Sequence, residues 1–265
     1  MPSFFFTLIS LEQIVTSEGN SGNIRLSISY DGTLYSGWQR QKNKPTVQGI
    51  IEKKIEFMSK KPASLTASGR TDAGVHALNQ VANFRIDSSI TPQIFKKGLN
   101  SLLPDDILIK QAEYVPLDFH ARYNAKSKIY QYIILNKQSL SPFLKNYVWH
   151  VPSSLNVQAI ENCLNIIKGT HDFSAFSSAK TSGTNFVREM IAAELKIRNN
   201  NLLSLTFKAN GFLRYMVRNL TGTIVKVASG HISMDLFEKI LMSKDRQHPG
   251  VKAPPNGLFL TRVNY

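Results

Sequence analysis

The spacing of the predicted strands limits the possible folds of this chain more than any other feature. The sequence predicts strands at 107–114 and 128–136, and again at 188–198 and 202–208. The members of each pair lie too close together for regular parallel crossover units, which need a helix between their strands. We therefore expect an α+β fold with a mostly antiparallel central sheet flanked by helices.

Further elements follow from hydrophobic periodicity and from capping residues. Apolar residues at alternate positions predict a strand that starts near Ile24, and QVANFRI (80–86) predicts another. Ser, Thr and Pro at helix starts and apolar residues at helical spacing predict helices after Thr46, Thr91 and Ser233, over about 211–228, and around Cys163. The helix after Thr91 is expected to pack through Ile94, Phe95, Leu99 and Leu102.

The chain is expected to divide into a flexible extension, residues 1–23, and two α/β halves, 24–118 and 119–265, which meet near VPLDFHAR. The first residues are apolar but lack a basic segment and a small-residue cleavage site, and Glu12 interrupts them. No run reaches the roughly 20 apolar residues that span a bilayer. We expect a cytoplasmic protein that does not bind a membrane.

The charge balance points to a polyanionic partner. Lys and Arg number 32 against 18 Asp and Glu, which gives a net charge of +14 and a pI near 9.8. Such an excess is typical of proteins that bind nucleic acid or an anionic membrane face, although it also aids solubility. One cysteine, Cys163, excludes an internal disulfide and a cysteine-rich zinc site.

The stretch GRTDAGVHA (69–77) holds the best candidate for a reactive group, Asp72. Gly69 and Gly74 flank it and would allow a sharp turn and the close approach of a ligand. The chain has no Walker loop, dinucleotide fingerprint, nucleophile elbow or pair of histidines at metal-ligand spacing. Composition alone leaves a second interpretation open, in which Asp72 only closes a solvated Asx-turn.

Several motifs together resemble those of the tRNA pseudouridine synthase A (TruA) family. GRTDAGVHA is similar to the segment that carries this family's catalytic acid. The other similar segments are in the expected order: SYDGTLYSGWQRQ (29–41), FHARYNAKSKIYQYII (119–134), HDFSAF (171–176), GFLRYMVRNLTG (211–222) and APPNGLFLTRVNY (253–265). The resemblance runs from about Ile24 to Tyr265 and leaves only the N-terminal extension unexplained.

The resemblance implies a role for four residues. Asp72 takes the place of the nucleophile, Tyr130 that of the tyrosine stacked on the target uracil, and Arg218 that of the basic partner of the acid. Arg70 matches an arginine implicated in displacing the target base. The resemblance also implies the pseudouridine synthase fold, with two similar halves around a cleft. It implies a homodimer that modifies uridines 38 to 40 of the tRNA anticodon stem-loop without a metal or cofactor.

The residues themselves are compatible with these roles. A guanidinium near Asp72 would lower its pKa and keep it ionised as a nucleophile. On the predicted helix, Arg214 and Arg218 share a face, where a nearby anion would relieve their repulsion. RNA contacts are predicted at Arg40, Lys42, Lys44, Lys126, Lys128 and Arg214. The atom that Asp72 attacks stays open, as do a tRNA-binding protein without activity and a glycosidase-like hydrolase.

Overall fold

The fold is built on one sheet that runs the length of the molecule. The computed structural model describes residues 21–178, 185–198, 201–245 and 251–265. Positions 1–20 of the expected extension lie outside these ranges. The first strand, β1 (Ser21–Tyr30), begins three residues before Ile24.

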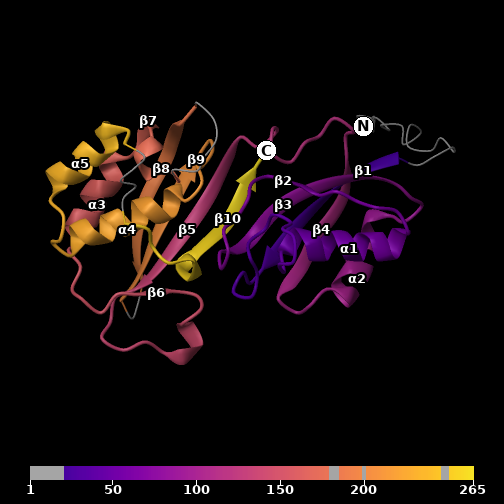
Figure 1. The fold of residues 1–265 in the computed structure, drawn as a ribbon, viewed down its shortest axis with the longest axis horizontal. Coiled ribbons are helices and arrows are strands. Elements are labelled where there is room, and N and C mark those ends of the chain that lie inside the picture. Colours follow the sequence, from indigo (N-terminus) through magenta and orange to yellow (C-terminus); the bar gives the residue numbers. More distant parts are fainter. Residues whose placement is uncertain (1–20, 179–184, 199–200, 246–250) are drawn as a thin grey trace, which may run out of the picture.

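The sheet has ten strands within the described residues, most of them antiparallel to their neighbours, as the sequence predicts (Figure 1). Its main path is β4-β1-β3-β10-β5-β9-β8-β7, with β2 paired to β3 and β6 paired to β5. The β3–β10 and β5–β6 pairs are parallel. After β1, the strands are β2 (Thr66–Ala67), β3 (His76–Asp87), β4 (Ile107–Val115), β5 (Ser127–Leu135), β6 (Trp149–His150), β7 (Gly169–Asp172), β8 (Val187–Arg198), β9 (Leu202–Ala209) and β10 (Leu258–Asn264).

Strand β10 joins the two ends of the sheet. It pairs with β3 through Leu260 and Ala77, and on its other side Leu260 lies opposite Tyr130 of β5. Figure 1 shows it running through the middle of the molecule, between strands of the first and second parts of the chain. Residues that are far apart in sequence therefore meet at the centre of the sheet.

The α-helices of the described ranges pack in two groups. They are α1 (Val47–Ser59), α2 (Pro92–Leu102), α3 (Val157–Ile166), α4 (Met216–Ala228) and α5 (Met234–Ser243). Figure 1 shows α1 and α2 beside β1, β3 and β4, and α3, α4 and α5 beside β7, β8 and β9. Buried apolar residues from both groups form a continuous core with the sheet.

Side-chain caps explain the starts of α2, α3 and α5. The side chains of Thr91, Asn156 and Ser233 each accept a hydrogen bond from a backbone N–H in the first turn of the helix that follows. Thr46 stands at the cap position of α1 but makes no such bond. In α2, the prediction for Ile94 is wrong, because its side chain is 55% exposed while Phe95 and Leu99 are buried.

Helix α4 is shorter than predicted. It begins at Met216 rather than near 211, because Tyr215 adopts the left-handed conformation, with φ +67°, and breaks the helical path. Arg214 therefore precedes the helix and does not share a helical face with Arg218. Leu213 is nevertheless buried, so the apolar pattern continues where the helix does not.

Candidate active site

Asp72 lies in the loop that joins β2 to β3, and backbone contacts hold this loop in place. The N–H of Trp38 donates to the carbonyl of Thr71 over 3.1 Å, and the N–H of Gly74 donates to the carbonyl of Tyr35 over 3.3 Å. The hydroxyls of Tyr30 and Thr71 are 2.8 Å apart and both residues are buried. The loop is thus fixed against the sheet and is not a solvated Asx-turn.

Glycines allow the loop to pack this closely. Gly74 has φ +76°, and a Cβ there would lie 2.9 Å from Cγ of Pro255. Gly37 has φ +93°, and a Cβ there would lie 2.6 Å from the carbonyl oxygen of Thr71. Gly69 differs from the prediction, because the nearest atom to an added Cβ is Cε of Lys128 at an ordinary 3.6 Å.

Arg218, near the start of α4, points its guanidinium at Asp72. Its Nη1 is 3.2 Å from Oδ2 of Asp72, and its Nε donates to the carbonyl of Ala253 over 2.8 Å. The N–H of Ala253 in turn donates to the carbonyl of Arg218 over 3.0 Å. Arg218 is buried, and these bonds leave its guanidinium little freedom to move. The structure therefore pairs Asp72 and Arg218 across 146 positions of the sequence.

The pKa of Asp72 differs from expectation. Burial raises it above the ordinary value of an aspartate, and this effect outweighs the opposing charge and hydrogen bond of Arg218 and the charges of Arg214 and Lys252. The guanidinium does favour the ionised form, but it offsets only part of the desolvation. With 23% of its side chain exposed, Asp72 still opens to solvent.

Two residues that the sequence analysis missed lie beside this pair. Among the described residues, three cations lie near the ring of Tyr215: Cζ of Arg214 at 4.8 Å, Cζ of Arg218 at 5.5 Å and Nζ of Lys252 at 4.6 Å. Arg214 also donates to the Tyr215 hydroxyl over 3.0 Å. Tyr215 follows Arg214 in a motif already identified, so only its role was missed, whereas Lys252 precedes APPNG with no local pattern to mark it.

Tyr130 lies on β5 and belongs to the same region. Burial is the main cause that raises its pKa well above the ordinary value, and the neighbouring Tyr30 and Asp72 raise it further. Its ring contacts that of Phe212 edge-on, with centroids 5.0 Å apart. The hydroxyl is therefore neutral at pH 7.

Apart from Arg214, none of the predicted RNA contacts, nor Arg70, is among the charges that act on the pKa of Asp72. Arg70 is exposed and its Nε donates to the side chain of Gln39 over 3.0 Å. Arg40 is 3.4 Å from the buried carboxylate of Glu52, on α1. Lys42, Lys44 and Lys126 are exposed.

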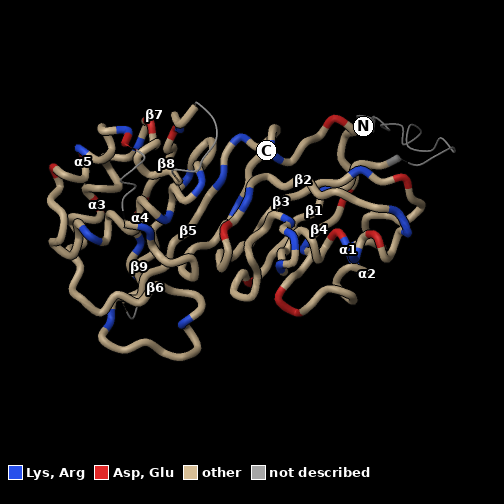
Figure 2. Tube along the Cα trace, in the orientation of Figure 1, with Lys and Arg blue, Asp and Glu red and all other residues tan. Residues whose placement is uncertain are grey.

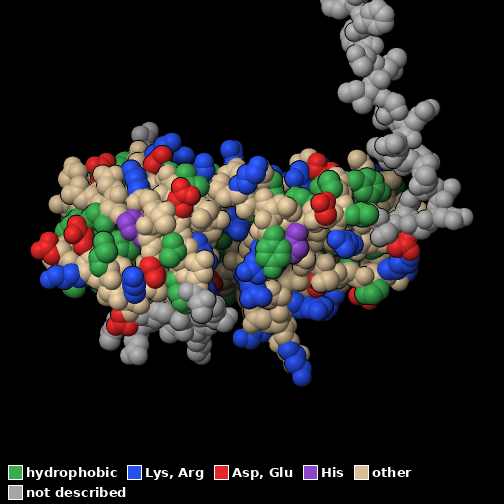
Figure 3. Space-filling model, turned by 90° about the horizontal axis from the view of Figure 1, so that it is seen from above, with side chains coloured by type: hydrophobic (Ala, Val, Ile, Leu, Met, Phe, Trp, Pro, Cys, Tyr) green, Lys and Arg blue, Asp and Glu red, His purple; other side chains and the backbone are tan. Residues whose placement is uncertain are grey.

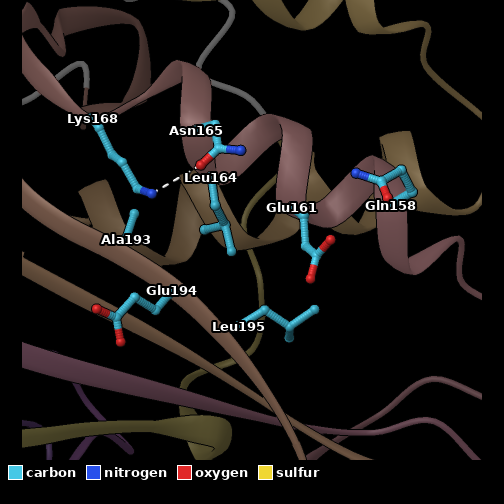
Figure 4. A pocket seen from close by; sticks show the side chains of 8 residues that line it. All are labelled: Gln158, Glu161, Leu164, Asn165, Lys168, Ala193, Glu194 and Leu195. Atoms are coloured by element: carbon cyan, nitrogen blue, oxygen red, sulfur yellow. Dashed lines mark hydrogen bonds between the residues drawn. The ribbon is translucent and has the colours of Figure 1, made fainter.

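Two surface pockets hold neither Asp72 nor its partners. A pocket of about 310 Å³ lies between α3 and β8, where Glu161 and Glu194 extend from opposite sides and Lys168 donates to Asn165 (Figure 4). A second, of about 640 Å³, is lined by α1 and the loop before it, including Arg40 and Glu52. None of the residues that line them comes from the Asp72 loop or from α4.

Basic residues lie both near the centre of the molecule and along its length. Figure 2 shows several Lys and Arg positions around β5 and others on the helices at both ends, and Figure 3 shows Lys and Arg side chains near the middle of the face in view and along its length. Among the described residues, no helix has the length and apolarity needed to cross a bilayer. Two basic residues besides Arg218, namely Arg214 and Lys252, lie near enough to Asp72 for their charges to act on it.

Known proteins share these features across most of the chain. A family model described as tRNA pseudouridine synthase matches residues 26–124 and 165–265. The tRNA pseudouridine synthase A of Thermoanaerobacter sp. (strain X514) is 43% identical over 243 residues, 92% of this chain and 99% of that protein. The tRNA pseudouridine synthase A of Geobacillus sp. (strain WCH70) is 45% identical over 246 residues, again 92% of this chain and 99% of that protein.

A solved structure titled "Crystal Structure of a Cbf5-Nop10-Gar1 Complex" aligns with a TM-score of 0.35 at 11% identity, over 89% of this chain and 48% of that one, and adds nothing to the assignment. The curated relatives, by contrast, match over nearly their whole length. By motif, by family model and by sequence identity, the chain belongs to the tRNA pseudouridine synthase A family.

Proposed function

We propose that this chain converts uridine to pseudouridine at positions 38 to 40 of the tRNA anticodon stem-loop, with Asp72 as the nucleophile. As a member of its family, the chain is an isomerase that acts on tRNA. The observation that carries the residue assignment is the contact between Asp72 and the buried Arg218, 3.2 Å apart. A carboxylate placed in a fixed loop and facing a fixed guanidinium is suited to nucleophilic attack.

The reaction exchanges one bond for another within the nucleotide. The bond between ribose C1′ and uracil N1 breaks, the base turns, and a bond forms between C1′ and C5. The proton on C5 is lost and N1 gains one, so the product has the composition of the substrate. Asp72 bonds transiently to the substrate, at C1′ or at the ring, and is released as a carboxylate.

Arg218 supports the ionised form of Asp72 in this scheme. The raised pKa favours the protonated form of Asp72, and the guanidinium opposes this effect. A partly desolvated carboxylate is also more reactive toward carbon than one fully surrounded by water. Burial and ion pairing thus act in opposite directions on the charge of the same side chain.

The proposed role of Tyr130 is to hold the displaced base. Extracting a base from its stack costs roughly a few kcal/mol, and stacking on an aromatic ring returns about 1–3 kcal/mol. The neutral hydroxyl can accept or donate a hydrogen bond but is a weak base, so its main proposed role is stacking. We assign to the exposed Arg70 the role of filling the space that the base leaves.

The wider proposals rest on the basic surface and on the family. Arg40, Lys42, Lys126 and Arg214 are all exposed and are proposed to contact RNA phosphates. The protein is proposed to act in the cytoplasm as a homodimer. The substrate is proposed to lie between the halves 24–118 and 119–265, because Asp72 comes from the first and Arg218 from the second.

Replacing the nucleophile tests the catalytic role. Asp72→Asn barely changes the size of the side chain. We expect it to slow the release of tritium from C5 of labelled tRNA uridine by about 10⁴-fold or more. Asp118→Asn, at an exposed position, is the matched control and should keep wild-type activity. Tritium release by the Asp72→Asn protein at the wild-type rate would overturn the assignment.

The same assay separates the alternatives. A protein that only binds tRNA would release no tritium even as wild type, and a hydrolase would yield free uracil and abasic tRNA by mass spectrometry. Pseudouridine mapping of tRNA from a deletion strain, with and without this protein, tests positions 38 to 40. Full modification at those positions without the protein would contradict the proposed substrate.

A further inference from the structure

Lys128 lies across the loop that carries Asp72. On β5 it sits between Val263 of β10 and Ala209 of β9, neither of which is charged. A Cβ built on Gly69 would be 3.6 Å from Cε of Lys128 and 3.9 Å from its Nζ. The ammonium group is therefore held over the backbone that leads into Asp72.

Arg188 on β8 lies in a similar way over the loop that leads to Arg218. A Cβ on Gly211 would be 3.3 Å from its Nε. Its Nη1 donates to the carbonyls of Val187, over 2.6 Å, and of Asn185, over 3.3 Å, and these neutral oxygens do not balance its charge. The loops that lead to Asp72 and to Arg218 are thus each covered by one cation at a glycine.

No acid balances these cations within the part of the chain that the structure describes. There, no carboxylate lies within 4.0 Å of Lys128, Arg188 or the exposed Arg122, and the side chain of Lys128 makes no hydrogen bond. Burial is the main cause that lowers the pKa of Lys128 to about 8, and the charges of Arg122 and Arg188 contribute to the same shift. Burial lowers the pKa of Arg188 as well.

A cluster of like charges at this depth is unfavourable without an anion. Phosphate oxygens suit the donors present, since arginine offers a planar fork of N–H groups and lysine a compact charge. The missing Cβ at Gly211 lets Arg188 lie close to the backbone of its loop, whereas a Cβ on Gly69 would make only an ordinary contact with Lys128. An anion bound here would contact the two segments that position Asp72 and Arg218.

We propose that Lys128 and Arg188 together bind one backbone phosphate of the RNA strand, beside the target nucleotide. This inference rests on the proposed function for the identity of the RNA. The phosphate would fix the ribose relative to Asp72, so the cluster is a positioning site. Exposed lysines such as Lys42, Lys44 and Lys126 differ from this cluster because they are not buried beside the loops that lead to Asp72 and Arg218.

The salt dependence of tRNA binding tests the site. The variant is Lys128→Gln. Its matched control is Lys97→Gln, which removes the same charge from an exposed lysine of α2. We expect Lys128→Gln to weaken tRNA binding about tenfold and to reduce the slope of log K against log salt by about one. Lys97→Gln should leave both unchanged.

The pH dependence of tRNA binding separates a phosphate-binding role of Lys128 from a purely structural one. A structural role would not make the affinity follow the charge of Lys128. Between pH 7 and 9.5, wild-type affinity should fall as Lys128 loses its proton above about pH 8, whereas Lys128→Arg stays charged and should bind evenly across this range. The charged groups that act on Lys128 are Arg122 and Arg188.

Equal salt slopes and equal pH profiles for wild type, Lys128→Gln and Lys97→Gln would overturn the site. Melting temperatures of the variants check that all three are folded. The outcome is separable from the proposed function, because these binding measurements need no catalysis. A wild-type protein without tritium release whose binding still depends on Lys128 would refute the isomerase assignment and keep the phosphate site.

Discussion

Asp72 is held in a state that is unfavourable for folding and favourable for reaction. Burial disfavours its charge, and its ion-pair partner, Arg218, compensates only partly, so the pKa is raised. An exposed aspartate would be ionised more easily but would be shielded by water from a carbon electrophile. This opposition places Asp72 among the residues whose perturbed pKa marks a functional site.

Removing the guanidinium should shift the acidic limb of the activity profile. In Arg218→Gln, Asp72 loses its largest favourable interaction, so its pKa should rise further. We expect kcat/KM to fall by about 10²–10³-fold at pH 7 and the half-maximal point on the acid side to move to higher pH. Tritium release measured from pH 4.5 to 8.5 checks this, with Lys97→Gln as control. An unmoved acid limb would show that Arg218 does not set the charge of Asp72.

Neutralising Asp72 should stabilise the protein at neutral pH. A folded-state pKa above the unfolded value means that ionisation of Asp72 opposes folding, and this cost appears as the pH rises through the two values. Asp72→Asn should therefore raise the melting temperature at pH 7, and the gain should shrink toward pH 4. Scanning calorimetry at both pH values measures it. A lower melting temperature at pH 7 would mean that the ion pair outweighs the burial.

At the scale of elements, α4 and the segment after Val251 form one unit. A Cβ on Gly222 would lie 1.7 Å from the carbonyl oxygen of Val251 and 2.8 Å from the backbone nitrogen of Ala253. The same segment supplies the carbonyl that accepts from Arg218, and it carries Lys252. The packing at Gly222 thus sets the position of two cations at the site.

Filling this contact should damage both stability and activity. We expect Gly222→Ala to lower the free energy of unfolding by about 1–3 kcal/mol and to reduce kcat, because the segment must move away from α4. Gly98→Ala in α2 is the control, since its nearest neighbour is the flexible end of Met58 and alanine favours the helix. Its stability should stay within about 1 kcal/mol of wild type. Urea unfolding compares the two, and equal stabilities would contradict this contact.

The elements with local signals could be predicted from the sequence, and those decided by long-range contacts could not. Ser233 and Thr91 mark real helix starts because a cap acts within one turn. The predicted start of α4 lies too early in the chain because Leu213 continues the apolar spacing, while the left-handed turn at Tyr215 is fixed by its packing. Lys252 escapes prediction for a related reason, since its place depends on contact with α4.

For the candidate site as well, the sequence predicts some features and not others. Asp72, Arg218 and Tyr130 are found through motifs, which identify residues but give no geometry. Arg218 lowers the Asp72 pKa as predicted, but burial raises it by more, and the sequence shows a possible partner without showing the depth of burial. Lys128 is predicted from the sequence as an RNA contact, but its burial is not, and Arg188 is missed altogether, since most lysines and arginines are solvated.

At the scale of the whole molecule, the net charge of +14 should dominate binding to tRNA. If the surface neutralises about six to ten phosphates, affinity should fall by about 10³–10⁵-fold between roughly 50 and 200 mM salt. Filter binding of unmodified tRNA across this range measures the slope. A slope near zero would mean that the charge serves solubility and that another force holds the RNA.

The central position of β10 has a consequence for how the protein is made. It follows all other described strands in the chain, yet it lies between β3 and β5. While a ribosome is still translating, β3 and β5 each have an open edge, and the segments bearing Asp72 and Arg218 have no strand to hold them in register. We therefore expect that a nascent chain completes the proposed catalytic pair, and can modify RNA, only after the segment from Leu258 to Asn264 has emerged.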